Sequence, residues 1–142
     1  MKTVYLLCCL ITSPVFCKSK VAADLGGTEL YLSRQEFMDI KVAEKRFGIR
    51  SLVENEFRKG TVDIRAPMAV FIVKSGLFSG KSTQQVRQIL GPSTGHFWND
   101  TVPAYIIEEG WRKQESTWQL VFLLRDDGRV LQSKIHKNCC PN

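Results

Sequence analysis

Two β-rich segments joined by a tight turn lie near the end of this chain, and they limit its fold more than any other feature. Residues 118–124 and 129–136 are dominated by apolar and β-forming side chains, and Asp126-Asp127-Gly128 lies between them. Asp-Gly is a common hairpin turn sequence. A third β-rich segment, 102–107, comes before them. The pattern predicts a three-stranded antiparallel meander.

Alternation within residues 118–124 predicts which side chains share a face of this sheet, because successive side chains in a strand point to opposite faces. One face receives large apolar residues, namely Trp118, Leu120, Phe122 and Leu124. The other face receives Gln119, Val121 and Leu123. We expect helices to cover the first face and to leave the second uncovered.

Helices are predicted ahead of the strands from capping signals and apolar residues at helical spacing. Ser-x-x-Glu/Gln capping boxes predict helix starts, and glycines that follow the apolar residues predict helix ends. The boxes begin at Ser33, Ser51 and Ser82, and the glycines are Gly48, Gly60 and Gly91.

The run 68–73 is apolar throughout and could be helix or strand. We interpret it as helix, because Pro67 suits a first helical turn and is poor inside a central strand. The predicted fold class is therefore α+β, with the N-terminal helices packed on one face of a three-stranded antiparallel meander.

The first 17 residues have the pattern of a secretory signal sequence. A short apolar run, 4–11, follows a single lysine, and two lysines come soon after Cys17. The run is too short to span a bilayer, and the alternative interpretation is a buried first strand or helix. We expect cleavage after Cys17, with a second possibility near Ala23. Lipid anchoring is disfavoured, because Phe16 stands where a small residue would precede a lipidated cysteine.

The remaining residues, 18–142, have the size and composition of one domain. The full chain is 142 residues long and 44% hydrophobic, which is enough to bury a core. Its net charge is +6 at pH 7, but the basic residues alternate with acidic ones, so no nucleic-acid binding is expected. Outside residues 1–17 the cysteines are Cys139 and Cys140, which do not make a disulfide framework.

No segment carries a complete catalytic or metal-binding pattern. Residues 76–83 resemble a phosphate-binding loop, but the spacing between their glycines is one residue too short. His136 with Cys139 and Cys140 could ligate a soft metal, although such a tail is more often a disulfide or accidental. We therefore expect no enzyme activity, cofactor, metal or small-molecule substrate.

A longer motif links the last helix to the strands. Residues 80–93 read Gly-Lys-Ser-Thr-Gln-Gln-Val-Arg-Gln-Ile-Leu-Gly-Pro-Ser, and Tyr105, Trp-Gln-Leu-Val-Phe at 118–122 and Asp-Gly-Arg-Val at 127–130 follow. This order resembles the SmpA/OmlA (BamE-like) family over residues 76–136. The resemblance implies helices on a three-stranded antiparallel sheet, as in the repeats of β-lactamase inhibitor protein. It also implies an envelope protein that binds proteins or lipid without catalysis.

These features lead us to expect a non-enzymatic, exported protein-binding module of the bacterial cell envelope, periplasmic or secreted. The resemblance allows a link to outer-membrane assembly or integrity and leaves peripheral membrane association open. The alternative is a secreted inhibitor or immunity-type protein that binds and blocks an enzyme.

Five apolar residues are the candidates for contacting a protein partner, because a few aromatic anchors supply much of the energy of an interface. They are Phe97, Trp98, Trp111, Val121 and Leu123. The competing interpretation is that helices fold over this face and bury them as ordinary core.

Overall fold

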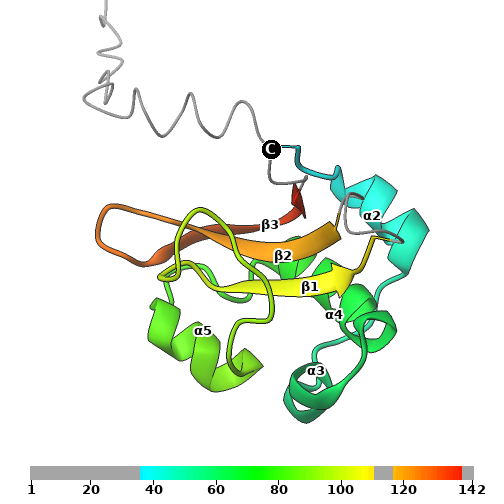
Figure 1. The fold of residues 1–142 in the computed structure, drawn as a ribbon, viewed down its shortest axis with the longest axis horizontal. Helices are drawn as coiled ribbons and strands as arrows, with labels where there is room; N and C mark the ends of the chain where they lie inside the picture. The colour runs from blue at the N-terminus through cyan, green and yellow to red at the C-terminus, as the bar shows by residue number, and fades with distance from the viewer. Residues whose placement is uncertain (1–35, 111–116, 139–142) are drawn as a thin grey trace, which may run out of the picture. The chain divides into compact units, whose positions relative to one another are not determined.

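The computed structural model describes residues 36–110 and 117–138, which belong to one compact unit, Arg34–Asn142. Helices pack against an antiparallel sheet of order β1-β2-β3 (Figure 1). The helices are α2 (Ile40–Phe47), α3 (Glu54–Lys59), α4 (Val62–Ser75) and α5 (Thr83–Leu90), and the strands are β1 (Ala104–Glu108), β2 (Thr117–Leu124) and β3 (Val130–Asn138). The α+β architecture predicted from the sequence is confirmed. The expected signal sequence, residues 1–17, lies outside the described residues.

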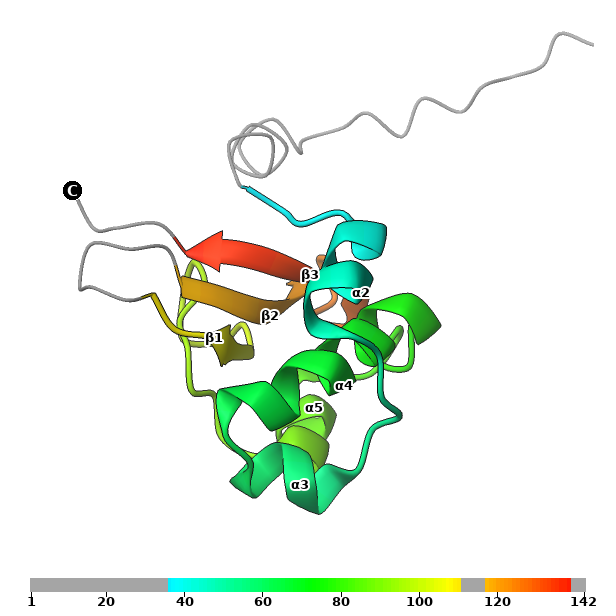
Figure 2. The same ribbon diagram turned by 90° about the vertical axis from the view of Figure 1, so that its right-hand side faces the viewer.

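The main core lies between the sheet and the helices, which Figure 2 shows on one side of the strands. Tyr105, Leu120 and Phe122 from the sheet are almost completely buried there. Ring contacts tie the layers together: Phe57 of α3 lies edge-on to Tyr105, and Phe78 lies edge-on to Phe122. The prediction that the Trp118–Leu120–Phe122 face meets the helices is therefore confirmed.

The first helix among the described residues, α2, begins later than the Ser33 capping box suggests. Asp39 is the N-cap of α2, and its carboxylate accepts hydrogen bonds from the amides of Lys41 and Val42. Residues 36–38 instead run antiparallel to the end of β3, where the Met38 amide donates to the Ile135 carbonyl at 2.9 Å. Pairing with a strand distant in sequence thus overrides the local helix signal, and Ser33 itself lies outside the described residues.

Two further helix boundaries correct the sequence prediction. The α3 helix begins at Glu54 after Val53, with no side-chain cap, so the Ser51 capping box does not form. The α4 helix begins at Val62, which places Pro67 inside it rather than in its first turn. Pro67 cannot donate to the carbonyl of Asp63, but Asp63 is exposed to water near the helix start.

The Ser82 capping box is confirmed in full. The Ser82 hydroxyl accepts from the Gln85 amide at 3.2 Å, and the Gln85 side chain accepts from the Ser82 amide at 2.9 Å. Gly91 ends α5 with φ 87°, a conformation that favours glycine. Since α5 leads directly into the next connection, its fixed ends determine where that connection starts.

The second face of the sheet is also covered, contrary to expectation. Gln119 and Val121 are completely buried and Leu123 is 8% exposed. Residues 91–103, which connect α5 to β1, cross this face, and Phe97 packs on the ring of His136 with centroids 4.7 Å apart. Phe37, from the segment beside β3, contacts the same ring at 5.4 Å. A loop and a short extended segment, rather than helices, bury this side.

Candidate functional site: the loop between α5 and β1

The loop of residues 91–103, named the 91–103 loop below, is closed at its base by backbone hydrogen bonds. The amides of Thr94 and Gly95 both donate to the Ala104 carbonyl at 3.0 Å. The Tyr105 hydroxyl donates to the Gly91 carbonyl at 2.8 Å from inside the core, and burial raises the pKa of Tyr105 to about 12. Tyr105 therefore remains a neutral donor throughout the physiological range.

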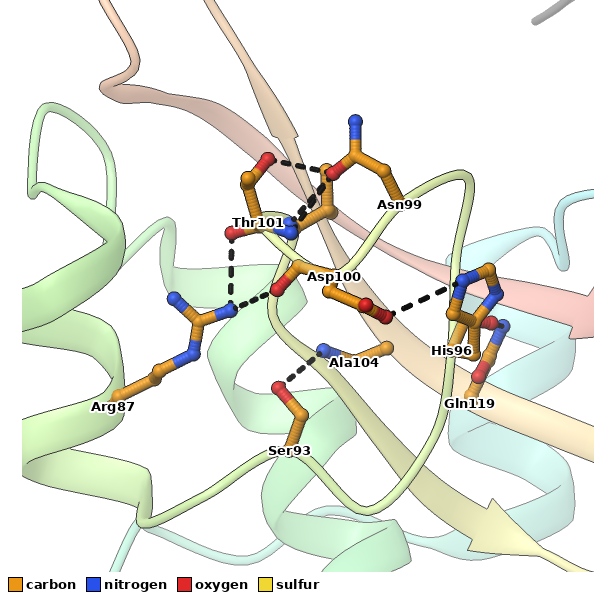
Figure 3. Close-up of polar contacts among 9 residues, drawn as sticks. Arg87, Ser93, His96, Asn99, Asp100, Thr101, Ala104 and Gln119 are labelled. Carbon is orange, nitrogen blue, oxygen red and sulfur yellow. Dashed lines mark hydrogen bonds and ion pairs between the residues drawn. The ribbon is translucent and has the colours of Figure 1, made fainter.

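A side chain of α5 and a turn within the loop hold its outer half (Figure 3). The Arg87 guanidinium donates to the carbonyls of Asp100 and Thr101 at 2.8 and 3.1 Å. The Asn99 side-chain oxygen accepts from the Thr101 amide at 2.9 Å, the Thr101 hydroxyl at 2.6 Å and the Val102 amide at 3.3 Å. Bonds of this kind from Asn to the following backbone are typical of rigid turns.

The inner half of the loop is held by buried groups on the second face of the sheet. Gln119 of β2 donates through Nε2 to the His96 carbonyl at 2.8 Å, and the same nitrogen lies 3.3 Å from His136 Nδ1. Phe97 is only 3% exposed. The loop backbone is thus held on both sides of Trp98, the residue that follows Phe97.

Trp98 lies at the tip of a tight and strained turn. Its φ is 62°, and among the described residues no other non-glycine residue has a positive φ. The Asn99 amide donates to the Phe97 carbonyl at 2.7 Å and closes a three-residue turn around it. A bulky residue in this region costs about 1–3 kcal/mol, and such strain concentrates at functional sites. Trp98 is 48% exposed.

A hollow of about 350 Å³ with a mixed polar and apolar lining lies beside the loop. Its lining includes Arg87, Ser93, His96, Asn99 and Asp100. His96 Nε2 lies 3.6 Å from an Asp100 carboxylate oxygen, and both side chains are largely exposed to solvent. The Ser93 hydroxyl accepts from the Ala104 amide at 3.4 Å, so its described hydrogen bond is to the backbone and not to His96. The groups are suited to hydrogen bonding at a surface, and their contacts do not form a nucleophile–base pair.

The structure describes four of the five residues proposed as a binding surface and separates them. Trp98 is the exposed member, whereas Phe97, Val121 and Leu123 are buried, because the loop closes over the second face. Trp111 lies outside the described residues. The prediction that the second face of the sheet is uncovered is therefore wrong, because the 91–103 loop covers it. The exposed apolar side chain at this place is Trp98, at the tip of that loop.

Sequence reasoning missed the residues that hold the loop, Arg87 and Gln119. Their partners are backbone carbonyls of a loop without periodicity, so no spacing rule identifies them. The signal that was available is Gln119 itself, a polar residue between Trp118 and Leu120 in a strongly apolar strand. A second signal was the sequence Asn99-Asp100-Thr101, because Asn and Asp favour turns.

Comparisons with known protein families, with curated proteins and with solved structures found no match for this chain. Among the helices that the structure describes, none has the length and apolar character needed to cross a membrane. Within residues 36–110 and 117–138, no three His, Cys, Asp or Glu side chains are grouped so as to hold a metal ion. Cys139 and Cys140 lie beyond these ranges.

Proposed function

We propose that this protein is an exported, non-enzymatic binding module that contacts a protein partner through Trp98 at the tip of the 91–103 loop. The strained, half-exposed position of Trp98 carries the proposal. A large apolar side chain that is half exposed and held in an unfavourable backbone conformation is typical of a recognition residue, and this combination favours a binding role for Trp98.

The rigidity of the loop supports the same function. Bonds from Arg87, Asn99 and Gln119 hold the backbone on both sides of Trp98. A backbone that is already held in position loses little further conformational freedom on binding, so more of the contact energy of Trp98 appears as affinity. Tryptophan is also enriched among the residues that dominate interface energies.

The resemblance of residues 76–136 to the SmpA/OmlA (BamE-like) family supports a bacterial cell-envelope location, with the signal-like residues 1–17 directing export. The partner proposed on this basis is an envelope protein. Contact with lipid, or inhibition of a single enzyme, would be a different function on the same scaffold.

Photo-crosslinking at Trp98 tests the proposal directly. A photoreactive phenylalanine analogue is placed at position 98 and, as a matched control, at Leu131 of β3, because the two residues are 48% and 49% exposed. We expect protein adducts in the native export compartment from position 98 that position 131 does not give. Identical adducts from both positions, or none from position 98, would contradict the proposal.

The identity of the adducts separates the functions. Membrane-barrel proteins or lipoproteins support the envelope module. A single hydrolase supports the inhibitor instead, and lipid adducts without protein support peripheral membrane association.

A further inference from the structure

Beneath the 91–103 loop lies a buried polar relay that the binding proposal does not by itself require. His136 of β3 is 4% exposed, Gln119 is completely buried, and the amide of Gln119 connects the His136 ring to the His96 carbonyl. Phe37 and Phe97 pack on the His136 ring.

The relay works only when Nδ1 of His136 is an acceptor. Gln119 Nε2 carries two hydrogens, and its contacts place one toward the His96 carbonyl at 2.8 Å and the other toward Nδ1 at 3.3 Å. Nδ1 must then be unprotonated, so the neutral ring carries its proton on Nε2. The relay is thus compatible with only one protonation state of the histidine.

Protonation of Nδ1 would place two donors against each other. The conflict is removed if the Gln119 amide turns so that Oε1 faces the His136 ring. This turn breaks no hydrogen bond to Oε1, because none of the described residues donates to it in its present position. The same turn brings Oε1 against the His96 carbonyl, where two acceptors repel each other. The orientation of Gln119 that gives protonated His136 an acceptor therefore removes the hydrogen bond from Gln119 to the His96 carbonyl, which holds the loop beside Trp98.

We propose that protonation of His136 releases the 91–103 loop from Gln119 and moves Trp98 out of its binding conformation. The effect on a partner rests on the proposed function, whereas the release of the loop does not. Gln119 and His136 are in this sense positioning residues for Trp98.

The charges around the ring determine when the release occurs. Burial lowers the pKa of His136 to about 4, and the carboxylate of Glu36, in the segment beside β3, partly opposes this effect. Glu36 also pairs with Lys137 of β3 at 2.9 Å. Lys134 lies on the same face of β3 as His136. On the loop side, Gln119 contacts the backbone carbonyl of His96, and the His96 ring pairs with Asp100. Release is therefore expected in acid rather than near neutrality.

A pH titration followed by nuclear magnetic resonance tests the release. The ring nitrogens of His136, the backbone amide of Trp98 and the core amides of Leu120 and Phe122 are followed from pH 7 to about pH 3. We expect the Trp98 amide to shift with the same midpoint as His136, while the two core amides stay unchanged through that midpoint.

Two variants assign the transition to its cause. In His136→Gln the coupled shift of Trp98 should disappear. In His96→Ala it should persist, because the relay uses only the backbone carbonyl of His96. The wild-type titration decides the question even if His136→Gln fails to fold.

Three outcomes would overturn the release. The Trp98 amide could stay unchanged while His136 titrates, the core amides could shift together with it, or His96→Ala could abolish the effect. Loss of partner binding to Trp98 at all pH values, with the coupled shift intact, would instead overturn only the proposed function.

Discussion

Acidification should destabilise this fold through His136. Its folded-state pKa, lowered by burial to about 4, lies below the ordinary value of 6.5, so the unfolded chain binds the proton first. The stabilisation is complete above about pH 6.5 and is lost as the pH falls through 4. With 1.36 kcal/mol per pH unit, the interval corresponds to ~3 kcal/mol of the free energy of unfolding.

Urea unfolding of the wild type and His136→Gln at pH 7, 5.5 and 4 measures this contribution. Between pH 7 and pH 4 the wild type should lose about 3 kcal/mol more than the variant, because glutamine does not titrate. His96→Ala is the matched control for the loss of an imidazole ring, and its side chain is 63% exposed. Equal pH dependence in the wild type and His136→Gln would refute the reasoning.

Three further predictions concern single positions. Ser82→Ala removes the acceptor for the Gln85 amide and should cost about 1 kcal/mol in denaturant unfolding; an unchanged midpoint would show that the cap does not stabilise α5. Gly95→Ala would place a Cβ 2.5 Å from Oε1 of the buried Gln119, so it should cost about 1–3 kcal/mol and lower the melting temperature, and a melting curve like that of the wild type would contradict this packing. The exported protein should lack residues 1–17 by intact-mass measurement in the native host, whereas a retained first residue or a lipid-modified Cys17 would exclude the proposed processing.

Two local signals in the sequence predicted local parts of the fold correctly, whereas the equally local Ser51 capping box does not form. The Ser82 capping box and the Asp-Gly hairpin turn depend on residues within a few positions of one another, and both are present. The α2 helix begins later than its local signal predicts, because its start depends on Met38 pairing with Ile135, which is far along the chain. No local pattern encodes such a pairing.

The covering of the second sheet face could not be predicted for a related reason. Alternation in β2 assigns Gln119 and Val121 to a common face, but it does not say whether a loop crosses that face. The loop itself has no periodicity, and its anchors are backbone carbonyls. The aromatic content at Phe97 and Trp98 indicated a functional or buried loop, and the structure buries Phe97 and leaves Trp98 48% exposed.

The affinity of the crosslinked partner for two single variants tests the role of Trp98 most directly. Trp98→Ala should weaken binding by about 30-fold or more, the equivalent of ~2 kcal/mol, and leave the melting temperature nearly unchanged. Leu131→Ala, at an equally exposed position, should bind like the wild type. If Trp98→Ala binds as tightly as the wild type, or melts many degrees lower, Trp98 is not the binding residue of this protein.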